Sequence, residues 1–208
     1  MSRICIFGAD GRTGVQVVKT AVLGGHSVVA FVYSKAGTYQ FDESVEVIQG
    51  NILDEHAVEK AVRGVDSVIS VVGHIKDTDS LMQTKGIQNV ISGMTKNNIK
   101  RLISLTGTGA RTEGDSPSVL DRFLNMIIAK VDPERISDGK KHVEVLQKSG
   151  LDWTVLRVLK LTNKDFDGDY SLTWHGPAEL FTSRAKVAKI MVDLATSSNY
   201  IHKMPISS

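Results

Sequence analysis

The sequence predicts an α/β fold: a doubly wound parallel sheet with a small C-terminal capping region. Three observations predict it. Short runs rich in Val, Ile and Leu alternate with helix-like segments, three glycines follow the first run, and the alternation loosens after residue 160. Runs that are apolar on both sides are typical of parallel strands covered by helices. We expect a single domain over residues 1–208, in which residues 160–208 form the cap and terminal helix.

The expected elements follow from the apolar periodicity of each segment. Strands are expected at residues 3–7, 27–33, 45–49, 66–72, 101–106 and 153–158. Helices are expected at residues 13–23, 55–63, 80–96 and, as one long helical region, 118–148. Within the third helix, Ile87, Val90, Ile91 and Met94 have the spacing of one buried face. Residues 163–179 are interpreted as loop or hairpin, followed by a helix at 183–196 and a short strand near 203–207.

Composition excludes several classes of protein. The chain has 208 residues, and its 25 Lys and Arg against 23 Asp and Glu leave a net charge of only +2. This balance gives no reason to expect a nucleic acid or a membrane surface as partner. No apolar segment approaches the roughly 18 residues that span a bilayer, and the start resembles no signal peptide. We therefore expect a cytoplasmic protein, with Cys5 a buried apolar residue and no metal site.

Residues 8–14 have the pattern G-x-x-G-x-x-G between the first strand and the first helix. In such loops the first glycine permits a tight turn, the second lets backbone approach a diphosphate, and the third lets the helix pack against the strand. A P-loop is excluded because Val15 follows the last glycine. The pattern predicts a Rossmann-like dinucleotide site, and the alternative is a merely tight turn. Its expected residues are Gly8, Asp10, Gly11, Arg12, Thr13 and Gly14.

The charges near this loop favour NADP(H) over NAD(H). Folds that prefer NAD place an acidic residue about 20 positions after the loop to bind the ribose hydroxyls. Here no acidic residue occurs between Asp10 and Asp42, and the second strand ends in Tyr33, Ser34 and Lys35. A hydroxyl and the cations Arg12 and Lys35 would bind a 2′-phosphate, which a carboxylate would repel. The alternative is that both cations are ordinary surface charges.

Six stretches of the chain resemble the atypical short-chain dehydrogenase/reductases, specifically their NmrA-like and biliverdin-reductase-B-like (flavin reductase) branch. They are IFGADGRTG (6–14), GNILD (50–54), DSVISVVG (66–73), RLISLTGTGA (101–110), HVEVLQKSGLDWTVLR (142–157) and TSRAKVAKIMVDLA (182–195). The resemblance implies that Asn51 and Ile52 flank the adenine. It also implies Val72 and Gly73 at the adenine-side ribose and diphosphate, and residues Leu105, Thr106 and Gly107 at the nicotinamide end.

The sequence departs from this pattern at four positions. Tyr33 stands where many relatives have Arg, so a 2′-phosphate would depend on Arg12, Ser34 and Lys35. Thr106 replaces a common Ser and keeps the hydroxyl. Val158 replaces a usual Pro, which leaves the substrate loop less defined, and Lys186 replaces a common Asp.

The usual machinery for carbonyl reduction is absent. Typical members use Tyr-x-x-x-Lys, and none of the four tyrosines has a lysine four residues later. Lys140 shares a helical stripe with Ile136, Val143 and Leu146, so we expect it to face inward and steady the nicotinamide ribose. The alternative is a surface pair between Lys140 and Glu144.

Two further side chains have two interpretations each, and a third has one. The Thr106 hydroxyl would orient the acceptor or relay a proton through water, or simply end a strand. His74 follows the fourth strand at the edge where such folds bind ligands, or is simply exposed, and His142 is expected on a helix surface.

The function expected from these residues and the resemblance is that of an NADP(H)-binding oxidoreductase. Hydride transfer to a flavin, a quinone or a similar planar acceptor needs no tyrosine acid, because the dinucleotide carries the chemistry. The alternative is an NmrA-like redox-sensing protein that binds the dinucleotide without turning it over. A sugar-nucleotide epimerase is disfavoured by the short segment after residue 160 and the missing Tyr/Lys pair. The sequence does not predict the oligomeric state.

Overall fold

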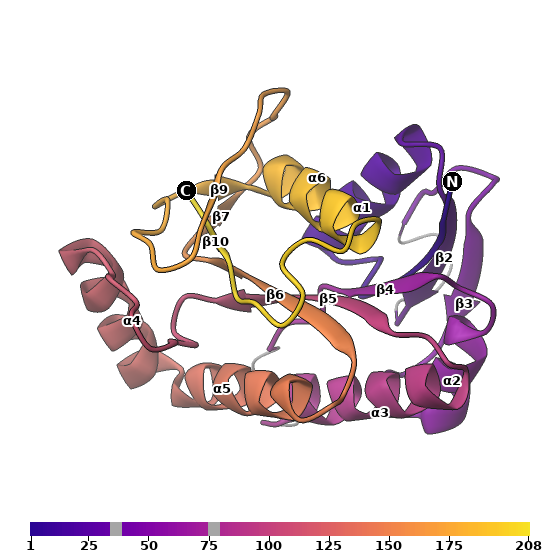
Figure 1. Ribbon diagram of the computed structural model, residues 1–208, viewed down its shortest axis with the longest axis horizontal. Helices are drawn as coiled ribbons and strands as arrows, with labels where there is room; N and C mark the ends of the chain where they lie inside the picture. The colour runs from indigo at the N-terminus through magenta and orange to yellow at the C-terminus, as the bar shows by residue number, and fades with distance from the viewer. Residues whose placement is uncertain (34–38, 75–79) are drawn as a thin grey trace.

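The computed structural model of the protein describes residues 1–33, 39–74 and 80–208. An eight-stranded sheet forms its centre, in the order β3-β2-β1-β4-β5-β6-β10-β8 (Figure 1). Its strands are β1 (Arg3–Phe7), β2 (Ser27–Val32), β3 (Glu46–Gln49), β4 (Ser67–Ser70), β5 (Arg101–Gly107), β6 (Asp152–Val158), β8 (Leu172–Thr173) and β10 (Ile206–Ser207). All neighbouring pairs are parallel except β10 with β8. The expected doubly wound parallel sheet is confirmed.

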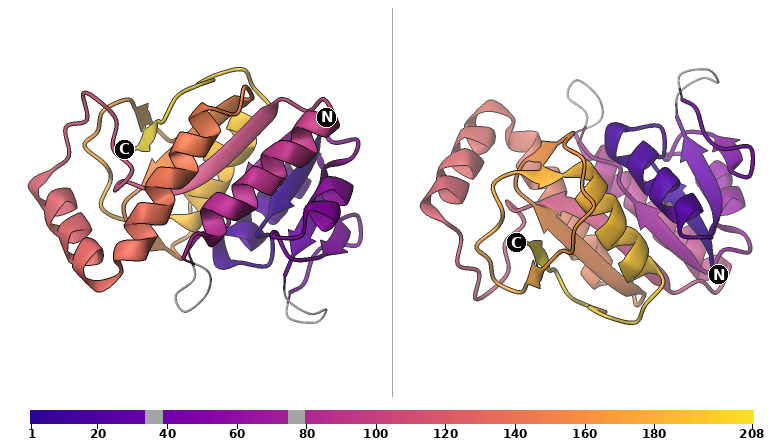
Figure 2. Two further views of the ribbon diagram at one scale, coloured as in Figure 1. Left: turned by 90° about the horizontal axis from the view of Figure 1, so that it is seen from below. Right: turned by 90° about the horizontal axis from the view of Figure 1, so that it is seen from above.

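Helices cover both faces of the sheet, as the views from below and from above show (Figure 2). One face carries α1 (Arg12–Leu23) and α6 (Arg184–Ala195), and the other carries α2 (Glu55–Val62), α3 (Met82–Lys96) and α5 (Pro133–Gln147). In β1, Cys5 and Phe7 point into the core under α2 and α3, while Ile4 and Ile6 point into the core under α1. Each strand is therefore apolar on both sides, which is why the strands appear in the sequence as continuous apolar runs.

The sheet reverses its direction of winding between β1 and β4. From β1 the chain adds β2 and β3 on one side, and then returns to add β4, β5 and β6 on the other. The loops that follow β1 and β4 consequently diverge at this point. In open α/β sheets the crevice outside the carboxyl ends of two such strands is where ligands bind.

The expected helix over residues 118–148 is wrong in one respect: the structure has two helices there. α4 (Val119–Val131) ends at Asp132, and α5 begins at Pro133. Proline has no N–H and its ring excludes the preceding turn, so it is tolerated only at the start of a helix. Asp132 caps the new helix by accepting a hydrogen bond from the Arg135 amide at 3.2 Å. α4 therefore leaves the body of the molecule at one end (Figure 1).

The segment after residue 160 forms short strands around the terminal helix. β7 (Leu161–Thr162) pairs in parallel with β9 (Thr182–Ser183), while β8 joins the main sheet through β10. The expected terminal helix and strand are present, and the strand is limited to Ile206–Ser207.

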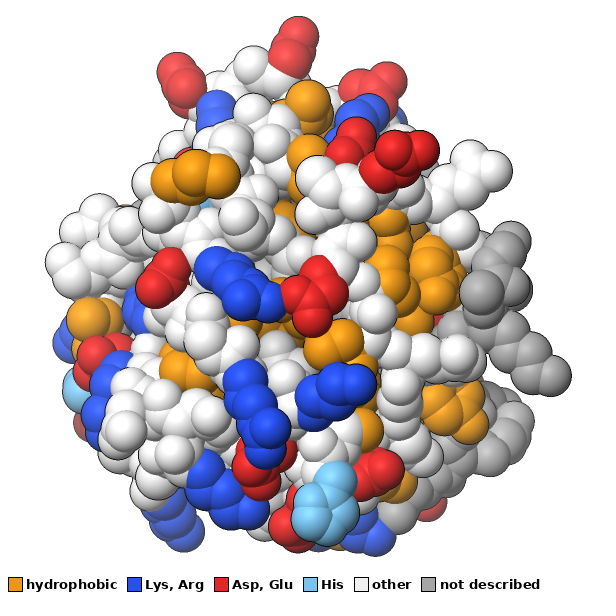
Figure 3. Space-filling model, turned by 90° about the vertical axis from the view of Figure 1, so that its right-hand side faces the viewer, with side chains coloured by type: hydrophobic (Ala, Val, Ile, Leu, Met, Phe, Trp, Pro, Cys, Tyr) orange, Lys and Arg blue, Asp and Glu red, His pale blue; other side chains and the backbone are white. Residues whose placement is uncertain are grey.

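Acidic and basic side chains are intermixed on the side of the molecule where β3 forms the sheet edge (Figure 3). The residues of β3 are largely exposed. A charged covering of this kind keeps an open sheet edge from pairing with another chain.

Candidate functional site

The glycine loop joins β1 to α1 with almost no space between backbone segments. Gly8 has a φ of +77°, a conformation that side chains rarely permit. A Cβ atom at Gly14 would lie 2.0 Å from the Gly8 carbonyl oxygen and 2.7 Å from Ala9 Cα. Only glycine fits at position 14, and the first turn of α1 is thereby held directly on the loop.

The N-terminus of α1 is suited to an anion. Its N-cap residue, Gly11, has no side chain to satisfy the first amides, and the first turn contains no acidic residue. Unsatisfied amides and the helix dipole together attract a phosphate. A cavity of about 540 Å³ opens over this turn, and we call it the glycine-loop cavity. The loop geometry therefore fits a dinucleotide diphosphate.

The glycine-loop cavity brings together most of the binding residues expected from the sequence. Its lining includes Gly8, Asp10, Gly11, Arg12, Thr13, Gly14, Tyr33, Asn51, Ile52, Val72 and Gly73. Ser34 and Lys35 lie outside the described residues. Asp10 accepts a hydrogen bond from the Tyr33 amide at 3.1 Å, which ties the loop to the end of β2. Phe31 and Leu53, which the sequence did not single out, add apolar surface to the wall.

A second cavity of about 620 Å³ lies against the end of β5, and we call it the β5 cavity. Leu105 and Thr106 line it, as do the apolar side chains of Leu124 and Ile128 from α4. Among the described residues, the Thr106 hydroxyl has no hydrogen-bond partner, although Thr106 is 8% exposed. Its hydroxyl is therefore available to a ligand in this cavity.

The two cavities adjoin each other along a common wall. Arg12, Thr13, Val71, Val72, Gly73, His74 and Arg184 line both of them. This wall is built from the loops after β1 and β4, which diverge at the reversal point of the sheet, and from the start of α6. One elongated ligand can therefore extend from the first cavity into the second.

The prediction that Lys140 faces inward is wrong. Lys140 is exposed and lines neither cavity, whereas Asp138, His142, Val143 and Leu146 form the buried stripe of α5. The helix keeps the expected period, but its buried stripe contains Asp138 and His142 and leaves Lys140 on the exposed side. Gly139 lies against the Thr106 hydroxyl, where a Cβ atom would be 3.2 Å from Oγ1.

Asp138 fixes the start of α3 from a distant part of the sequence. Its buried carboxylate accepts hydrogen bonds from the Gln83 amide at 3.0 Å, the Thr84 amide at 2.9 Å and the Thr84 hydroxyl at 2.5 Å. The N-cap residue of α3, Leu81, offers no side-chain cap of its own. Asp138 therefore acts as the cap of this helix.

His142 is fully buried, so the expectation of a surface position is wrong. Its Nε2 lies 2.8 Å from the Ser104 hydroxyl oxygen. Burial lowers the pKa of His142 to about 4, against a partial opposing effect of Asp138. The imidazole is accordingly neutral at physiological pH.

His74 is also buried rather than exposed. Its side chain is 4% exposed, and Nε2 lies 3.4 Å from Oδ1 of Asp132 at the junction of α4 and α5. His74 thus connects the loop after β4 to the α4–α5 junction across the common wall of the cavities.

Arg184 is a candidate binding residue that the sequence analysis did not identify. It is 9% exposed, and Nη1 donates to Asn163 Oδ1 at 2.7 Å, while the buried Nε has no partner. Burial and repulsion from Arg12 lower the pKa of Arg184. A buried donor without a partner costs free energy, and an anion placed between the two guanidiniums would satisfy it. The stretch TSRAKVAK contains Arg184, but only the fold brings it next to the glycine loop.

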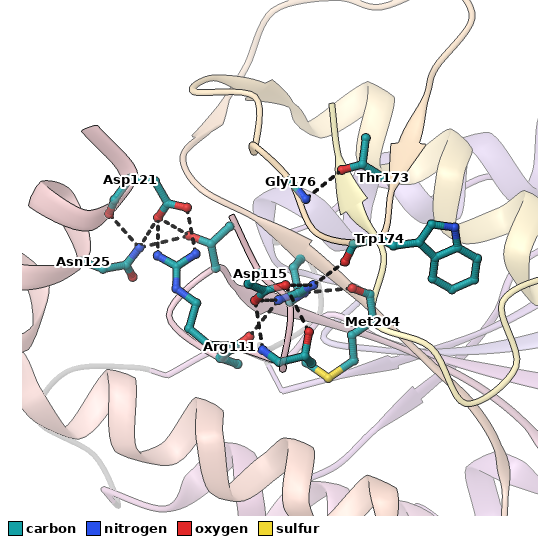
Figure 4. A network of polar contacts seen from close by, with 12 residues as sticks. Arg111, Asp115, Asp121, Asn125, Thr173, Trp174, Gly176 and Met204 are labelled. Atoms are coloured by element: carbon teal, nitrogen blue, oxygen red, sulfur yellow. Dashed lines mark hydrogen bonds and ion pairs between the residues drawn. The ribbon is translucent and has the colours of Figure 1, made fainter. Parts of the chain in front are cut away.

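A polar network holds the far wall of the β5 cavity (Figure 4). Arg111 donates two hydrogen bonds of 2.9 Å to the buried carboxylate of Asp121 on α4. The Thr108 hydroxyl donates to the same carboxylate at 2.9 Å, and Asn125 Nδ2 donates to Thr108 Oγ1 at 3.0 Å. Thr108 and Asn125 line the cavity, so this network fixes α4 to the loop after β5.

In the described part of the chain, no helix is long and apolar enough to cross a membrane. Within those same residues there is no group of three His, Cys, Asp or Glu side chains placed to bind a metal ion.

Sequence comparison finds relatives that match part of this chain. Phenylcoumaran benzylic ether reductase IRL1 from Ginkgo biloba is 33% identical over 98 residues, which are 43% of this chain and 32% of that protein. The matched part spans about a third of the length of the curated relatives. Their full activities therefore do not transfer to this chain directly.

Two solved structures share the fold at low sequence identity. An anaerobillin reductase from Escherichia coli O157:H7 has a TM-score of 0.82 and 22% identity, over 99% of this chain and 96% of that one. A short-chain dehydrogenase/reductase from Veillonella parvula DSM 2008, in complex with NADP, has a TM-score of 0.82 and 19% identity, over 100% of this chain and 94% of that one.

The family model described as NAD(P)H-binding matches residues 8–198. Every described residue that lines the two cavities lies inside that range. The resemblance found in the sequence is confirmed, and the chain belongs to the NAD(P)H-binding family.

Proposed function

We propose that the protein is an NADP(H)-dependent reductase that transfers a hydride to a flavin, a quinone or a similar planar acceptor. The observation that supports this function is the common wall of the two cavities. The glycine-loop cavity has the backbone geometry for a dinucleotide, and the β5 cavity beyond it has a mixed lining that combines apolar side chains of α4 with the free Thr106 hydroxyl. A reductase needs two such adjoining spaces.

In this proposal, the residues of the chain bind the dinucleotide, orient the acceptor and shield the acceptor from water. The amides at the start of α1, with Arg12 and Arg184, hold the phosphates of the dinucleotide. Leu124 and Ile128 exclude water from the acceptor, and Thr106 orients it through its hydroxyl. When bound, the reduced dinucleotide supplies a hydride (two electrons and one proton), and a proton from solvent completes the reduction of the acceptor.

The preference for NADP(H) rests on Arg12. Arg12 lines the glycine-loop cavity, as does Tyr33 after the end of β2, and the carboxylate of Asp10 accepts a hydrogen bond from the Tyr33 amide. NADPH should raise the melting temperature more than NADH does. Arg12→Gln should weaken NADPH binding about ten- to a hundredfold and NADH binding clearly less, with Arg122→Gln, on the surface of α4, as the control. An equal loss for both dinucleotides would contradict a role at the 2′-phosphate.

Arg184 is proposed to bind the diphosphate, which both dinucleotides contain. Arg184→Gln should therefore weaken the binding of NADPH, NADH and ADP-ribose by similar factors, about tenfold or more. Isothermal titration calorimetry with the three ligands measures this. Unchanged ADP-ribose affinity would remove Arg184 from the diphosphate site.

The second candidate is a redox-sensing protein that binds the dinucleotide without turnover. The missing Tyr-x-x-x-Lys motif and the exposed Lys140 favour it. Oxidation of NADPH, followed at 340 nm with riboflavin, FMN or 2-methyl-1,4-naphthoquinone, separates the two functions. Continuous turnover supports the reductase, and tight binding without turnover supports the sensor.

A further inference from the structure

The β5 cavity is lined by several cations and by no acid among the described residues. Its cationic side chains are Arg12, Arg135, Lys160 and Arg184. Arg12 and Arg184 also line the glycine-loop cavity, where the proposed function uses them for the cofactor phosphates. Arg135 and Lys160 line only the β5 cavity. Two positive charges therefore remain on the acceptor side after the dinucleotide phosphates are accounted for.

Neither of these two side chains is neutralised within the described residues. No ion pair joins Arg135 or Lys160 to a described carboxylate. The Lys160 ammonium lies 5.3 Å from the centroid of the Phe181 ring, a contact that stabilises a cation without cancelling its charge. Arg135 contributes its backbone amide to the Asp132 cap, and its guanidinium has no hydrogen bond to a described residue. Both residues are exposed, as expected at the mouth of the cavity.

The carboxylates around the cavity are already engaged by other groups. Asp132 accepts a hydrogen bond from the Arg135 amide, and its Oδ1 lies 3.4 Å from Nε2 of His74. Asp121 is paired with Arg111, and Asp115 is paired with Arg157. Asp138 accepts its hydrogen bonds from the start of α3. The field at the acceptor end of the cavity is consequently positive, and a cleft with weakly polarisable walls concentrates such a field.

The apolar side chains that line the cavity indicate what kind of molecule would carry the complementary negative charge. Leu124 and Ile128 of α4, Ile136 of α5 and Leu161 of β7 provide apolar surface around it. We propose that the acceptor has an apolar planar body with an acidic substituent, a carboxylate or a phosphate, and that Arg135 and Lys160 bind this substituent. The inference rests on the proposed function, because it takes the β5 cavity as the acceptor site.

The test compares acceptors that share a redox-active body and differ by one acid. Riboflavin and FMN differ by a phosphate, and 1,4-naphthoquinone and its 2-carboxylate differ by a carboxylate. Binding to the full-length protein saturated with NADP⁺ is measured by fluorescence quenching for the flavins and by calorimetry for the quinones. We expect at least one acidic member to bind about tenfold more tightly than its neutral partner. The pair with the larger ratio identifies the acid.

Substitutions then assign the effect to the two cations. Arg135→Gln and Lys160→Gln should each reduce the ratio of acidic to neutral binding by about threefold or more, and leave the neutral member unchanged. Lys141→Gln, an exposed lysine on the same helix as Arg135 and outside both cavities, is the matched control. The assignment is overturned if the ratio of acidic to neutral binding is unchanged in both variants. It is also overturned if this ratio falls equally in the Lys141→Gln control.

Failure of the proposed function can be distinguished from failure of this inference. Saturation by NADP⁺ is measured first, and its failure counts against the dinucleotide site alone. The same flavin and quinone pairs are in that case compared on the free protein. Acidic and neutral members that bind within threefold of each other, in both pairs, would overturn the inference even if NADPH oxidation proceeds.

Discussion

The guanidinium of Arg157 and the carboxylate of Asp115 form an ion pair whose side chains are 0% and 3% exposed. Arg157 lies on β6 and also donates hydrogen bonds to the carbonyl oxygens of Met204 at 2.8 Å and Trp174 at 3.1 Å (Figure 4). One side chain therefore joins three segments that are distant in sequence: the loop after β5, the segment after β8 and the chain before β10.

Asp115→Asn is expected to destabilise the protein by about 3–5 kcal/mol, because it leaves the Arg157 charge buried without a counter-ion. Urea denaturation at pH 7 gives this free energy of unfolding. Asp169→Asn is the control, since Asp169 is fully exposed and lies 3.9 Å from Lys189, a surface pair that contributes little. Equal midpoints for the two variants would show that the buried pair does not stabilise this fold.

Because the pKa of buried His142 is lowered, we expect the free energy of unfolding to decrease in mild acid. The pKa of its imidazole is about 4 in the folded protein and 6.5 ordinarily. Between these values the unfolded chain binds a proton that the folded chain does not. Stability is complete above pH 6.5 and falls by about 3 kcal/mol as the pH is lowered to about 4.

The matched variant for this effect is His142→Gln, which keeps a polar group near Ser104 and removes the titration. Free energies of unfolding at pH 7.5, 6 and 5 should decline more steeply for the natural sequence than for the variant. Parallel pH profiles would mean that His142 does not resist protonation in the folded protein.

Gly14→Ala should destabilise the protein by about 3 kcal/mol or more, because the new Cβ atom would collide with three backbone atoms of Gly8 and Ala9. Gly73→Ala provides the contrast. Its Cβ atom would meet nothing within 4 Å, and it would enter the space common to both cavities. Thermal denaturation should leave the Gly73 variant unchanged while calorimetry shows weaker dinucleotide binding. A Gly14 variant with an unaltered melting temperature contradicts the close packing of α1 on the loop.

Lys140→Gln is expected to leave dinucleotide affinity and turnover unchanged, since the side chain is exposed and lines neither cavity. Steady-state oxidation of NADPH and calorimetry with NADP⁺ measure both quantities. A tenfold fall in either would restore the ribose-binding role that the position of Lys140 in the sequence predicted.

Much of the fold is predictable from the sequence because its signals are local. The apolar runs of β1 and β2 mark parallel strands, and the three glycines mark the tight turn between β1 and α1. The break between α4 and α5 also had a local signal, since Asp132 followed by Pro133 is a typical helix start. The expectation of one helix gave that signal too little weight against the apolar periodicity around it.

The errors at the site have a different physical origin, because they depend on contacts between distant residues. Asp138 is buried because it caps α3, more than 50 residues earlier in the chain. His142 is buried because Ser104 of β5 meets it. Arg184 lies beside Arg12 only when α6 packs on α1. Polar groups buried for tertiary partners disrupt the apolar stripe from which buried helix faces are predicted.

The cap that Asp138 places on α3 has a consequence for how the two ligands affect each other. At the turn that it holds, Met82 faces the glycine-loop cavity, while its neighbour Gln83 faces the β5 cavity. This turn therefore contributes side chains to both cavities and is anchored to a third element, α5. A ligand that displaced this turn in one cavity would change the room in the other, and any such coupling between two ligands would be reciprocal.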